Sequence, residues 1–532
     1  MTQLSDLAVA VGAHIEIVGG EPSPQGDLAV TGIDLRAQGI RPGDLFAALP
    51  GAHAHGASFA ATALDHGAVA VLTDAAGRDL VAAASTRPVP VLVHPDPRSV
   101  LGTASATVYG HPSRSMQVIG ITGTSGKTTT AYLVEAGLAA AGRATGLVGT
   151  VETRIGGTRL PSSLTTPEAP QLHALFAVMR ERGVDTVVME VSSHALALGR
   201  VAATDFAVGA FTNLSQDHLD FHKDLDDYFS AKARLFAADS AVRARRAVVC
   251  VDDEWGVRAA ELARIGRDDR DAVRTVATGR AADWTVTADE SLADGTQRFT
   301  LTGPDGVARP GTVGLPGRYN VTNAALAVAI CEAVGADVDA AIRGIAHVAV
   351  PGRVERVDRG QDFLAVVDYA HKPAALGAVL ETLRAATSGR IAVVIGAGGD
   401  RDRTKRPIMG EVAARGAELL IVTDDNPRTE NPAAIRAAVL DGAWSVPAGD
   451  RGEIRELGDR AAAIEAAVAW AQPGDVVLVA GKGHETGQEI DGVKHPFDDR
   501  EVLAAALDKR RTAGPDGHHP PAAGGTHHGG NA

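Results

Sequence analysis

The feature that most constrains this chain is an apolar, β-branched run that enters a glycine-rich turn and leaves it as a helix. The run Val118–Ile121 leads into Thr122-Gly123-Thr124-Ser125-Gly126-Lys127-Thr128-Thr129, and a helical pattern follows from Ala131 to Ala141. A strand, a tight loop and a helix in this order are the context of a phosphate-binding loop. Glycine lets backbone N–H groups curl round an anion, and the helix N-terminus adds partial positive charge. In such a loop Lys127 reaches the outer phosphates and the hydroxyl of Thr128 faces a magnesium ion.

The match to the usual phosphate-loop pattern is incomplete. That pattern has a glycine six positions before its lysine, where this chain has Ile121. The motif that fits instead is T-G-T-x-G-K-T. A turn rich in Gly and Thr without a ligand is the alternative, but the flanking strand and helix favour a site for a nucleoside triphosphate.

Length and composition bound the remaining possibilities. A chain of 532 residues is expected to hold about three domains of typical size. Its 45% hydrophobic and 22% charged residues are typical of a soluble globular protein. The formal net charge of −14 argues against a nucleic-acid partner, whose phosphates favour a basic surface. Local donors and a metal, not overall charge, must therefore hold any anionic substrate.

The cysteines and the apolar runs indicate the compartment. The two cysteines, Cys250 and Cys331, each lie in an apolar run and are expected to be buried free thiols, although a disulfide stays open. The first twenty residues lack the pattern of a signal peptide, and no apolar run is long enough to span a bilayer. We therefore expect a cytoplasmic protein without membrane insertion.

The pattern along the chain predicts an α/β fold of three domains. Residues 1–114 read as a small α/β domain, with strand-like runs at Leu28–Ile33, Asp44–Ala48, Val69–Thr73 and Val89–His94. Residues 115–350 read as a central domain with a P-loop-type mononucleotide-binding parallel sheet, and the alternation between Trp284 and Leu315 predicts antiparallel hairpins.

Residues 351–511 read as a Rossmann-like domain of alternating strands and helices. The expected elements are Phe363–Val367, Ala374–Ala386, Ile391–Ile395, Leu419–Val422, Pro432–Trp444 and Val476–Ala480. Residues 512–532 are rich in Pro, Gly and His without apolar periodicity, so we expect a disordered tail.

Two polar side chains follow apolar strands of the central domain. Glu190 ends the run from Asp185, and His218 lies shortly after the run Ala207–Phe211. Open parallel sheets bind ligands at this edge, and a carboxylate with an imidazole suits magnesium or its neighbouring shell. A surface glutamate and a helix-capping histidine are the alternative. Lys232 lies in an amphipathic helical pattern, which by itself predicts a solvated lysine.

Three polar loops follow strands of the last domain. They contain Arg401, the segment Asp425-Asn426-Pro427-Arg428, and Gly481-Lys482-Gly483-His484-Glu485. A guanidinium pairs bidentately with a carboxylate, so two arginines at this edge suit a carboxylate-bearing ligand. Three surface turns are the alternative.

The sequence resembles the Mur ligase family, the ATP-dependent amide-bond-forming enzymes of peptidoglycan precursor synthesis. The resemblance runs from about Val30 to Glu501 and rests on T-G-T-S-G-K-T, M-E-V-S-S-H, T-N-L-S-Q-D-H-L-D-F-H, G-R-Y-N-V-T-N, D-Y-A-H-K-P and G-G-D-R-D. Within the family, Thr165-Thr166-Pro167, Lys232 in its Y-F-x-A-K-x-x-L-F setting, D-N-P-R and G-K-G-H-E resemble the enzymes that add the third peptide residue.

The resemblance implies a reaction, its substrates and a set of site residues. The substrates implied are ATP, UDP-MurNAc-L-Ala-D-Glu and meso-diaminopimelate, with Mg²⁺ as cofactor and an acyl phosphate as intermediate. The implied catalytic residues are Lys127, Glu190, His218 and Lys232, and the implied metal ligands are Thr128, Glu190, His218 and Lys232 as a carbamate. Implied ATP contacts are Gly123, Thr124, Ser125, Gly126, Lys127, Thr128, Thr129, Asn320, Asn323, Arg353 and Asp368.

The remaining implied contacts belong to the two other substrates. Those for the UDP-muramoyl dipeptide are Ile33, Leu35, Ala52, His53, Ala54, Thr165, Thr166, Ser192, Leu198 and Arg200. Those for diaminopimelate are Arg401, Asp425, Asn426, Pro427, Arg428, Gly481 and Glu485. Leu35 and Leu198 stand where some members carry Ser and Gln, so contacts there must run through the backbone or be absent.

Three alternatives and the oligomeric state complete the expectations. The lysine-adding relative and folylpolyglutamate synthetase share the ATPase core, but Thr165-Thr166-Pro167 and D-N-P-R argue against both. A non-catalytic, nucleotide-dependent regulator is disfavoured by the presence of Glu190, His218 and Lys232 together. We expect a monomer.

Overall fold

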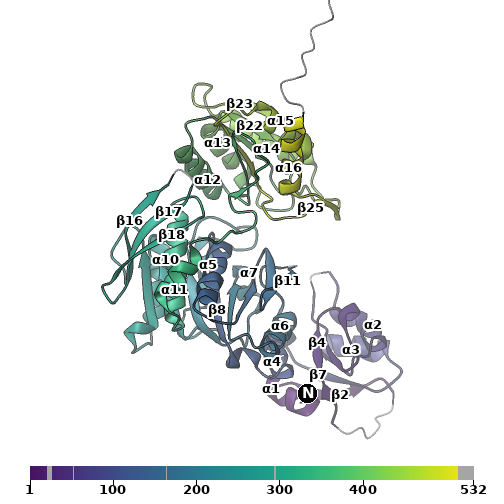
Figure 1. Ribbon diagram of the computed structural model, residues 1–532. Helices are drawn as coiled ribbons and strands as arrows, with labels where there is room; N and C mark the ends of the chain where they lie inside the picture. The colour runs from purple at the N-terminus through teal and green to yellow at the C-terminus, as the bar shows by residue number, and fades with distance from the viewer. Residues whose placement is uncertain (21–26, 52, 163, 293–294, 513–532) are drawn as a thin grey trace, which may run out of the picture. The chain divides into compact units, whose positions relative to one another are not determined.

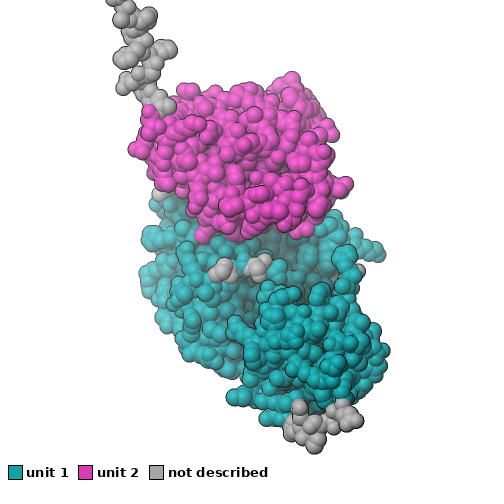
Figure 2. All heavy atoms as spheres, turned by 90° about the vertical axis from the view of Figure 1, so that its right-hand side faces the viewer, with its two compact units in different colours: residues 1–350 teal, residues 351–532 magenta. Residues whose placement is uncertain are grey.

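A computed structural model of the protein describes residues 1–20, 27–51, 53–162, 164–292 and 295–512. Of the predicted tail, Thr512 ends a helix and residues 513–532 lie outside the described residues. The chain forms two compact units, Met1–Val350 and Pro351–Ala532, which Figure 2 shows in different colours. Both contain sheets of mainly parallel strands with helices on both faces, which confirms the predicted α/β fold class. The domain boundaries predicted at residues 114, 350 and 511 stay predictions.

A five-stranded sheet fills the first part of unit 1. Its order is β2–β7–β6–β5–β4, and only β2 is antiparallel. The strands are β2 (His14–Val18), β4 (Gly32–Asp34), β5 (Asp44–Ala47), β6 (Ala70–Thr73) and β7 (Val89–Val93). Helices α1 (Leu4–Val11) and α4 (Pro97–Val108) pack on one face, and α2 (Ala60–Asp65) and α3 (Ala75–Ala84) on the other. The predicted run Leu28–Ile33 divides between β4 and β3 (Ala29–Val30), which pairs with β1 (Thr2–Gln3).

An eleven-stranded sheet forms the rest of unit 1, in the order β11–β10–β9–β12–β8–β13–β14–β15–β16–β17–β18. Its middle is parallel and its two ends are antiparallel hairpins, as predicted for the segment from Trp284. The strands are β8 (Gln117–Thr122), β9 (Thr145–Val148), β10 (Glu152–Ile155), β11 (Thr158–Pro161), β12 (Thr186–Glu190), β13 (Phe206–Phe211), β14 (Arg246–Cys250), β15 (Val273–Ala277), β16 (Trp284–Ser291), β17 (Gln297–Thr302) and β18 (Ala308–Val313).

Two apolar cores lie on the two faces of this sheet. One contains α5 (Lys127–Ala140), α10 (Tyr319–Ala333) and α11 (Val338–Ile345). The other contains α6 (Ala169–Glu181), α7 (Ser193–Ala197), α8 (Leu225–Ala233) and α9 (Glu254–Arg264). Because both faces are covered, the central strands are apolar throughout and not alternating, as buried parallel strands are.

The strand order decides which loops meet. β8 lies between β12 and β13, although these three strands are far apart in the sequence. All three run parallel, so their carboxyl ends share one edge of the sheet. This edge brings together the glycine-rich loop after β8, Glu190 at the end of β12, and the polar segment after β13.

Unit 2 holds a six-stranded sheet in the order β19–β20–β24–β21–β22–β23, in which only β19 is antiparallel. The strands are β19 (Glu355–Arg356), β20 (Leu364–Asp368), β21 (Ile391–Ile395), β22 (Leu419–Val422), β23 (Glu453–Glu456) and β24 (Val476–Ala480). One face packs against α12 (Pro373–Ala386), α13 (Lys405–Gly416) and α14 (Pro432–Ser445), and the other against α15 (Arg460–Trp470) and α16 (Asp499–Thr512). A hairpin of β25 (Gly487–Ile490) and β26 (Val493–Pro496) follows β24.

The cysteines agree with the prediction of buried free thiols. Cys250 and Cys331 are free and buried, and burial raises the pKa of each thiol to about 12. Among the described helices, none combines the length and the apolarity needed to cross a bilayer.

Candidate active site

The glycine-rich loop closes on itself in the way that its sequence predicts. Helix α5 begins at Lys127, earlier than the predicted Ala131, because Gly126 turns the chain with φ of 85° and its carbonyl accepts a hydrogen bond from Thr130. The Lys127 ammonium donates to the carbonyl oxygens of Gly123 at 2.9 Å and Thr124 at 3.1 Å. The lysine therefore folds back over the loop that it is predicted to serve.

Side chains of the segment directly after β13 contact the loop. After β13, Asn213 accepts a hydrogen bond from the Ser125 N–H at 3.0 Å, and the Thr212 hydroxyl donates to the Ser125 carbonyl at 2.7 Å. Gly123 has φ of 143°, and a Cβ there would lie 1.9 Å from the Thr212 hydroxyl oxygen. Thr212 and Asn213 had no role in the sequence-based prediction, although their position directly after a buried strand was a signal for one.

The predicted nucleotide contacts Asn320 and Asn323 lie on α10 and reach the same loop. Asn323 accepts from the Thr130 hydroxyl at 3.3 Å and donates to Asn320 at 3.0 Å. A Cβ on Gly126 would lie 2.6 Å from the Asn323 side-chain oxygen. The loop and α10 are thus in close contact, and only glycine permits this approach.

Glu190 is buried at the centre of the site, which excludes the alternative of a surface glutamate. It is 1% exposed, and its Oε2 accepts a hydrogen bond from the Thr128 hydroxyl at 2.9 Å. A hydroxyl and a carboxylate side by side, at a helix N-terminus that could bind phosphate, are the oxygen ligands that Mg²⁺ prefers. The two residues therefore fit the predicted metal. The described side chains contain no group of three or more His, Cys, Asp and Glu arranged to hold a metal ion, so the fit depends on Thr128.

The helical pattern alone misplaced Lys232. It is 1% exposed, not solvated, and its ammonium donates to the Gly123 carbonyl at 2.8 Å and lies 4.3 Å from the centre of the Tyr228 ring. The Tyr228 hydroxyl accepts from Thr124 at 3.2 Å, and burial raises its pKa. An amphipathic pattern marks one buried stripe on a helix, but it does not show that a neighbouring loop covers another position.

His218 lies in the turn after β13 and adopts a positive φ of 55°. Its Nε2 is 3.0 Å from Asp217, its side chain is 41% exposed, and its ring centre is 4.8 Å from that of His194. Burial, and then the charge of His222, lowers the pKa of His194. The aromatic contacts of Tyr228 with His218 and of Lys232 with Tyr228 connect this turn to the glycine-rich loop.

Of the residues predicted to hold the dipeptide, Thr166 contacts Glu190 directly. The Thr166 hydroxyl donates to the Glu190 carbonyl at 2.9 Å and accepts from the Ser192 N–H at 3.1 Å. Arg200 forms an ion pair with Glu168 at 2.8 Å, and Thr165 lies 3.0 Å from the hydroxyl of Thr150. Leu198 is partly buried at the end of α7. Glu168 and Thr150 were not predicted.

The residues predicted for the uridine end lie in the five-stranded sheet and its loop. Ile33 and Leu35 flank Asp34, and Ile33 is buried in the local core that Leu35 packs against, so neither side chain is freely available to a ligand. Asp34 accepts from Gln171 of α6 at 3.1 Å. His53 and Ala54 are exposed, and Ala52 lies outside the described residues.

In unit 2, Arg353 and Asp368 lie near each other. The Arg353 guanidinium stacks 4.5 Å from the Tyr369 ring centre, and the buried Asp368 carboxylate accepts from the N–H groups of Val354 and Ala370, each at 2.7 Å. Burial raises the pKa of Asp368, and the charge of Arg353 opposes this shift.

Three adjacent strands of unit 2 carry the predicted amino-acid loops. β24, β21 and β22 are neighbours in the sheet, so the segments with Gly481, Arg401 and Arg428 share one edge, as predicted. Asn426 donates to Glu485 at 2.9 Å, and Arg428 donates to the Gly399 carbonyl at 2.6 Å and pairs with Glu489 at 3.3 Å.

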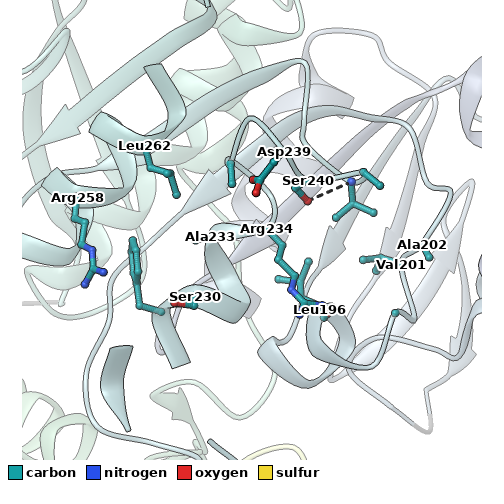
Figure 3. Close-up of a pocket in the computed structure, with 15 residues that line it drawn as sticks. Leu196, Val201, Ala202, Ser230, Ala233, Arg234, Asp239, Ser240, Arg258 and Leu262 are labelled. Carbon is teal, nitrogen blue, oxygen red and sulfur yellow. Dashed lines mark hydrogen bonds between the residues drawn. The ribbon is translucent and has the colours of Figure 1, made fainter. Parts of the chain in front are cut away.

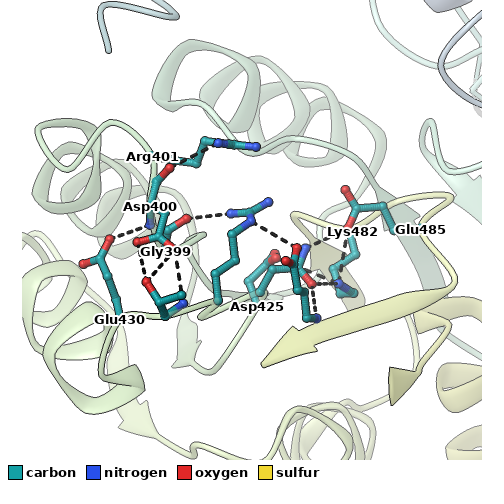
Figure 4. Close-up of polar contacts among 11 residues, drawn as sticks. Gly399, Asp400, Arg401, Asp425, Glu430, Lys482 and Glu485 are labelled. Carbon is teal, nitrogen blue, oxygen red and sulfur yellow. Dashed lines mark hydrogen bonds and ion pairs between the residues drawn. The ribbon is translucent and has the colours of Figure 1, made fainter. Parts of the chain in front are cut away.

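Within this edge the predicted residues do not form one cluster. Asp425 and Pro427 are buried beside Asn426. Arg401 is exposed and donates to the Asp400 carbonyl at 3.2 Å, and Figure 4 shows it apart from Asp425 and Glu485.

A buried lysine that had no predicted role organises these loops. Lys482 is 0% exposed, and its ammonium donates to Asn426 at 3.0 Å and to Glu485 at 3.3 Å, with Asp425 at 3.9 Å (Figure 4). Its place in the G-K-G-H-E motif was a signal for a role. Only the fold shows that three predicted diaminopimelate contacts, Asp425, Asn426 and Glu485, lie around its ammonium.

A cavity of unit 1 lies away from these residues. It has a volume of about 640 Å³ and is lined by parts of α7, α8 and α9, including Leu196, Phe229, Arg234 and Arg258 (Figure 3). Arg234 uses its guanidinium to donate to the Leu196 carbonyl at 2.8 Å. None of the predicted site residues lines this cavity.

Comparisons with known proteins identify similar sequences and folds. The Mur ligase middle domain matches residues 121–331, the Mur ligase glutamate ligase domain matches residues 352–483, and the Mur ligase family catalytic domain matches residues 29–109. Curated relatives from Corynebacterium efficiens and Streptomyces coelicolor are each 54% identical to this chain. They cover 94% and 92% of it, and 95% of their own lengths. Both bear the name UDP-N-acetylmuramoyl-L-alanyl-D-glutamate–2,6-diaminopimelate ligase. A solved structure of the same name is 32% identical, covers 90% of this chain and 95% of its own, and has a TM-score of 0.61.

Proposed function

Because the chain belongs to the Mur ligase family, we propose that this ATP-dependent, amide-bond-forming ligase adds meso-2,6-diaminopimelate to the D-glutamyl γ-carboxylate of UDP-MurNAc-L-Ala-D-Glu in peptidoglycan synthesis. The observation that carries the reaction is the convergence of Lys127, Thr128 and Glu190 at one sheet edge. The substrate assignment is supported by the two relatives that are 54% identical over nearly the whole chain.

The first chemical step brings two anions together. The γ-carboxylate attacks the γ-phosphate of ATP, which forms an acyl phosphate and releases ADP. Charge neutralisation is therefore the main task, and the Lys127 ammonium and the N-terminus of α5 suit it. A magnesium ion held by Thr128, Glu190 and His218 would neutralise phosphate charge when bound. The amine of diaminopimelate then adds to the acyl carbon, and phosphate leaves.

The proposed contacts of ATP and of the dipeptide are those that the resemblance to the family implies. In unit 1 the proposed ATP contacts are Gly123, Thr124, Ser125, Gly126, Lys127, Thr128, Thr129, Asn320 and Asn323. Arg353 and Asp368, in unit 2, stay predicted ATP contacts. The dipeptide is held by Thr165, Thr166, Ser192 and Arg200. The close packing of Asn323 on Gly126 supports the first set, and the hydrogen bond of Thr166 to the Glu190 carbonyl supports the second.

Lys232 is proposed to act as a carbamate. Its ammonium and that of Lys127 both donate to the Gly123 carbonyl, so the positive charge of the buried Lys232 has a second positive charge beside it. Reaction of the neutral Lys232 amine with carbon dioxide, with loss of one N–H proton to solvent, would replace one of these charges with a carboxylate. Like charges repel and opposite charges attract, so the modification relieves this repulsion and adds an oxygen ligand for Mg²⁺.

The amino-acid substrate is proposed to bind at Arg428, Asn426 and Glu485. Diaminopimelate ends in a second head with a carboxylate, whereas lysine ends in an ammonium only. Arg428 suits the carboxylate and disfavours the ammonium. The Asn426–Glu485 contact at 2.9 Å supports a shared pocket.

Phosphate release by the purified protein tests this proposal. With ATP and Mg²⁺, release is expected only when UDP-MurNAc-L-Ala-D-Glu and meso-diaminopimelate are both present. The same assay with L-lysine, and with a folate plus glutamate, should give little release. Release that is independent of the amino acid, or that is faster with lysine, contradicts the assignment.

A further inference from the structure

The turn between β9 and β10 reaches the carboxylate of Glu190 with both backbone and side chain. The Thr150 N–H donates to Glu190 Oε1 at 2.7 Å, and the Thr150 hydroxyl donates to Oε2 at 3.1 Å. A Cβ on the preceding Gly149 would lie 2.5 Å from Oε1, so only glycine lets the turn approach this closely. The turn is therefore built against this carboxylate.

These contacts leave little of the carboxylate unused. A carboxylate offers about four acceptor positions. The Thr150 N–H, the Thr150 hydroxyl and the Thr128 hydroxyl occupy three of them. The orientation of Glu190 toward a cation thus depends on Thr150 as much as on Thr128.

The same Thr150 hydroxyl is 3.0 Å from the hydroxyl of Thr165. A hydroxyl has one proton, and that of Thr150 goes to Glu190, so Thr165 is the donor in this contact. The hydrogen bonds then run in one direction, from Thr165 through Thr150 to Glu190. Thr165 is left with an oxygen that accepts and no proton to give, which suits an N–H group of a substrate.

We propose that Thr150 is a positioning residue that couples binding of the muramoyl dipeptide to the orientation of Glu190, and that Thr165 meets the substrate as a hydrogen-bond acceptor. The inference rests on the proposed function, in which Thr165 contacts the dipeptide and Glu190 contacts Mg²⁺. An N–H group that donates to Thr165 polarises its hydroxyl, which strengthens the bond to Thr150 and the bond beyond it. The stronger bond holds the Glu190 carboxylate in the orientation that Thr150 and Thr128 set, so the metal no longer has to order it. The substrate and the metal favour each other's binding through this ordering, and linkage makes the effect reciprocal.

Equilibrium binding measures the coupling without turnover. The dissociation constant of UDP-MurNAc-L-Ala-D-Glu is determined by calorimetry with and without Mg²⁺ and a β,γ-methylene analogue of ATP. For the unaltered protein we expect binding to tighten about five- to twentyfold when both are present. Thr150→Val keeps the shape and the backbone N–H but removes the hydroxyl, and this ratio should fall below about twofold. Thr150→Ser keeps the hydroxyl and should keep the ratio.

Each outcome decides the proposal. A Thr150→Val protein that keeps the full ratio overturns it, as does an unaltered protein whose ratio is one. If Thr150→Ser loses as much as Thr150→Val, the methyl group and not the hydroxyl is responsible, and the proposal is wrong. Should Thr150→Val not fold, as judged by its melting temperature, Thr165→Val breaks the same chain from the other end and must lower the ratio equally. In the double variant the two losses should not add. An unaltered protein that does not bind the UDP-dipeptide at all instead contradicts the proposed function.

Discussion

The ammonium groups of Lys127 and Lys232 meet on one atom, the carbonyl oxygen of Gly123, at 2.9 and 2.8 Å. One lysine is the first residue of α5 and the other lies near the end of α8. A single loop carbonyl thus holds the two cations that the proposed reaction uses in opposite ways, one as a cation and one as a carbamate.

Removing Lys232 tests the second of these roles. Lys232→Ala should lower kcat at least a hundredfold, because the carbamate and its metal contact are lost, and short carboxylates added to the assay should restore part of the activity. A carbamate signal in ¹³C NMR with labelled bicarbonate should be present in the unaltered protein and absent from the variant. Lys223→Ala, at an exposed lysine just before α8, is the matched control and should retain full activity. Full activity of Lys232→Ala rules the role out.

Alanine substitutions at two glycines with nearly equal φ can distinguish the effect of backbone strain from that of contacts in the phosphate loop. Gly126 and Gly142 have φ of 85° and 81°, and only at Gly126 would a Cβ meet another side chain, that of Asn323. A left-handed alanine costs roughly 1–2 kcal/mol at either position. Both variants should lose this stability in urea unfolding, and Gly126→Ala should lose more, because its Cβ also meets Asn323. Only Gly126→Ala should raise the KM for ATP, by tenfold or more. An equal rise in KM in both variants contradicts the role of the loop.

Arg428 permits a test of specificity that does not depend on stability. Its backbone has a positive φ of 52°, which glycine tolerates better than arginine. Arg428→Gly should therefore melt within a few degrees of the unaltered protein. Its KM for diaminopimelate should rise ten- to a hundredfold, since a charged hydrogen bond is worth about 1.5–3 kcal/mol. The KM for ATP should not change. An unaltered kcat/KM for diaminopimelate refutes the assignment.

The buried Lys482 should affect both folding and substrate. Lys482→Met removes the buried ammonium that pairs with Glu485 and lies near Asp425, which is expected to cost about 3–5 kcal/mol in the free energy of unfolding. The surviving folded protein should bind diaminopimelate more weakly, because Asn426 and Glu485 lose their common donor. The control is Lys509→Met, at an exposed pair with Glu465, and should cost less than about 1 kcal/mol. Similar losses in the two variants contradict this prediction.

The pKa of Glu430 determines how its contribution to the stability of the folded protein changes with pH. Hydrogen bonds from Arg406, followed by that from the Asp400 N–H, lower the pKa of Glu430 from its ordinary value of 4.5 to about 2. The folded state thus binds this proton less readily than the unfolded state, so the stabilisation is present above pH 4.5 and is lost as the pH falls toward 2. The difference in melting temperature between the unaltered protein and Glu430→Gln should shrink as the pH is lowered from 6 to 3.5. A constant difference contradicts the assigned cause.

Local motifs predicted the parts of the site that are contiguous in the sequence. Apolar β-branched residues form the strand before Gly123, and glycines at positive φ form the turn that leads into the helix. Because these features lie in consecutive residues, the sequence alone predicted the loop. The same holds for β21, β22 and β24, whose predicted bounds match the structure.

What the sequence determined by itself was the type of each element and the loop at which each polar group lies, because backbone preferences and apolar periodicity act over a few residues. Only the tertiary structure decided which of those loops meet. The order β12–β8–β13 placed Glu190 beside Thr128. The glycine-rich loop covers Lys232, which its helical pattern had predicted to be solvated. The β9–β10 turn brought Thr150 to the carboxylate of Glu190, forty residues further along the chain. Such contacts depend on strand order and on burial by distant segments, and neither is encoded in the spacing of neighbouring residues.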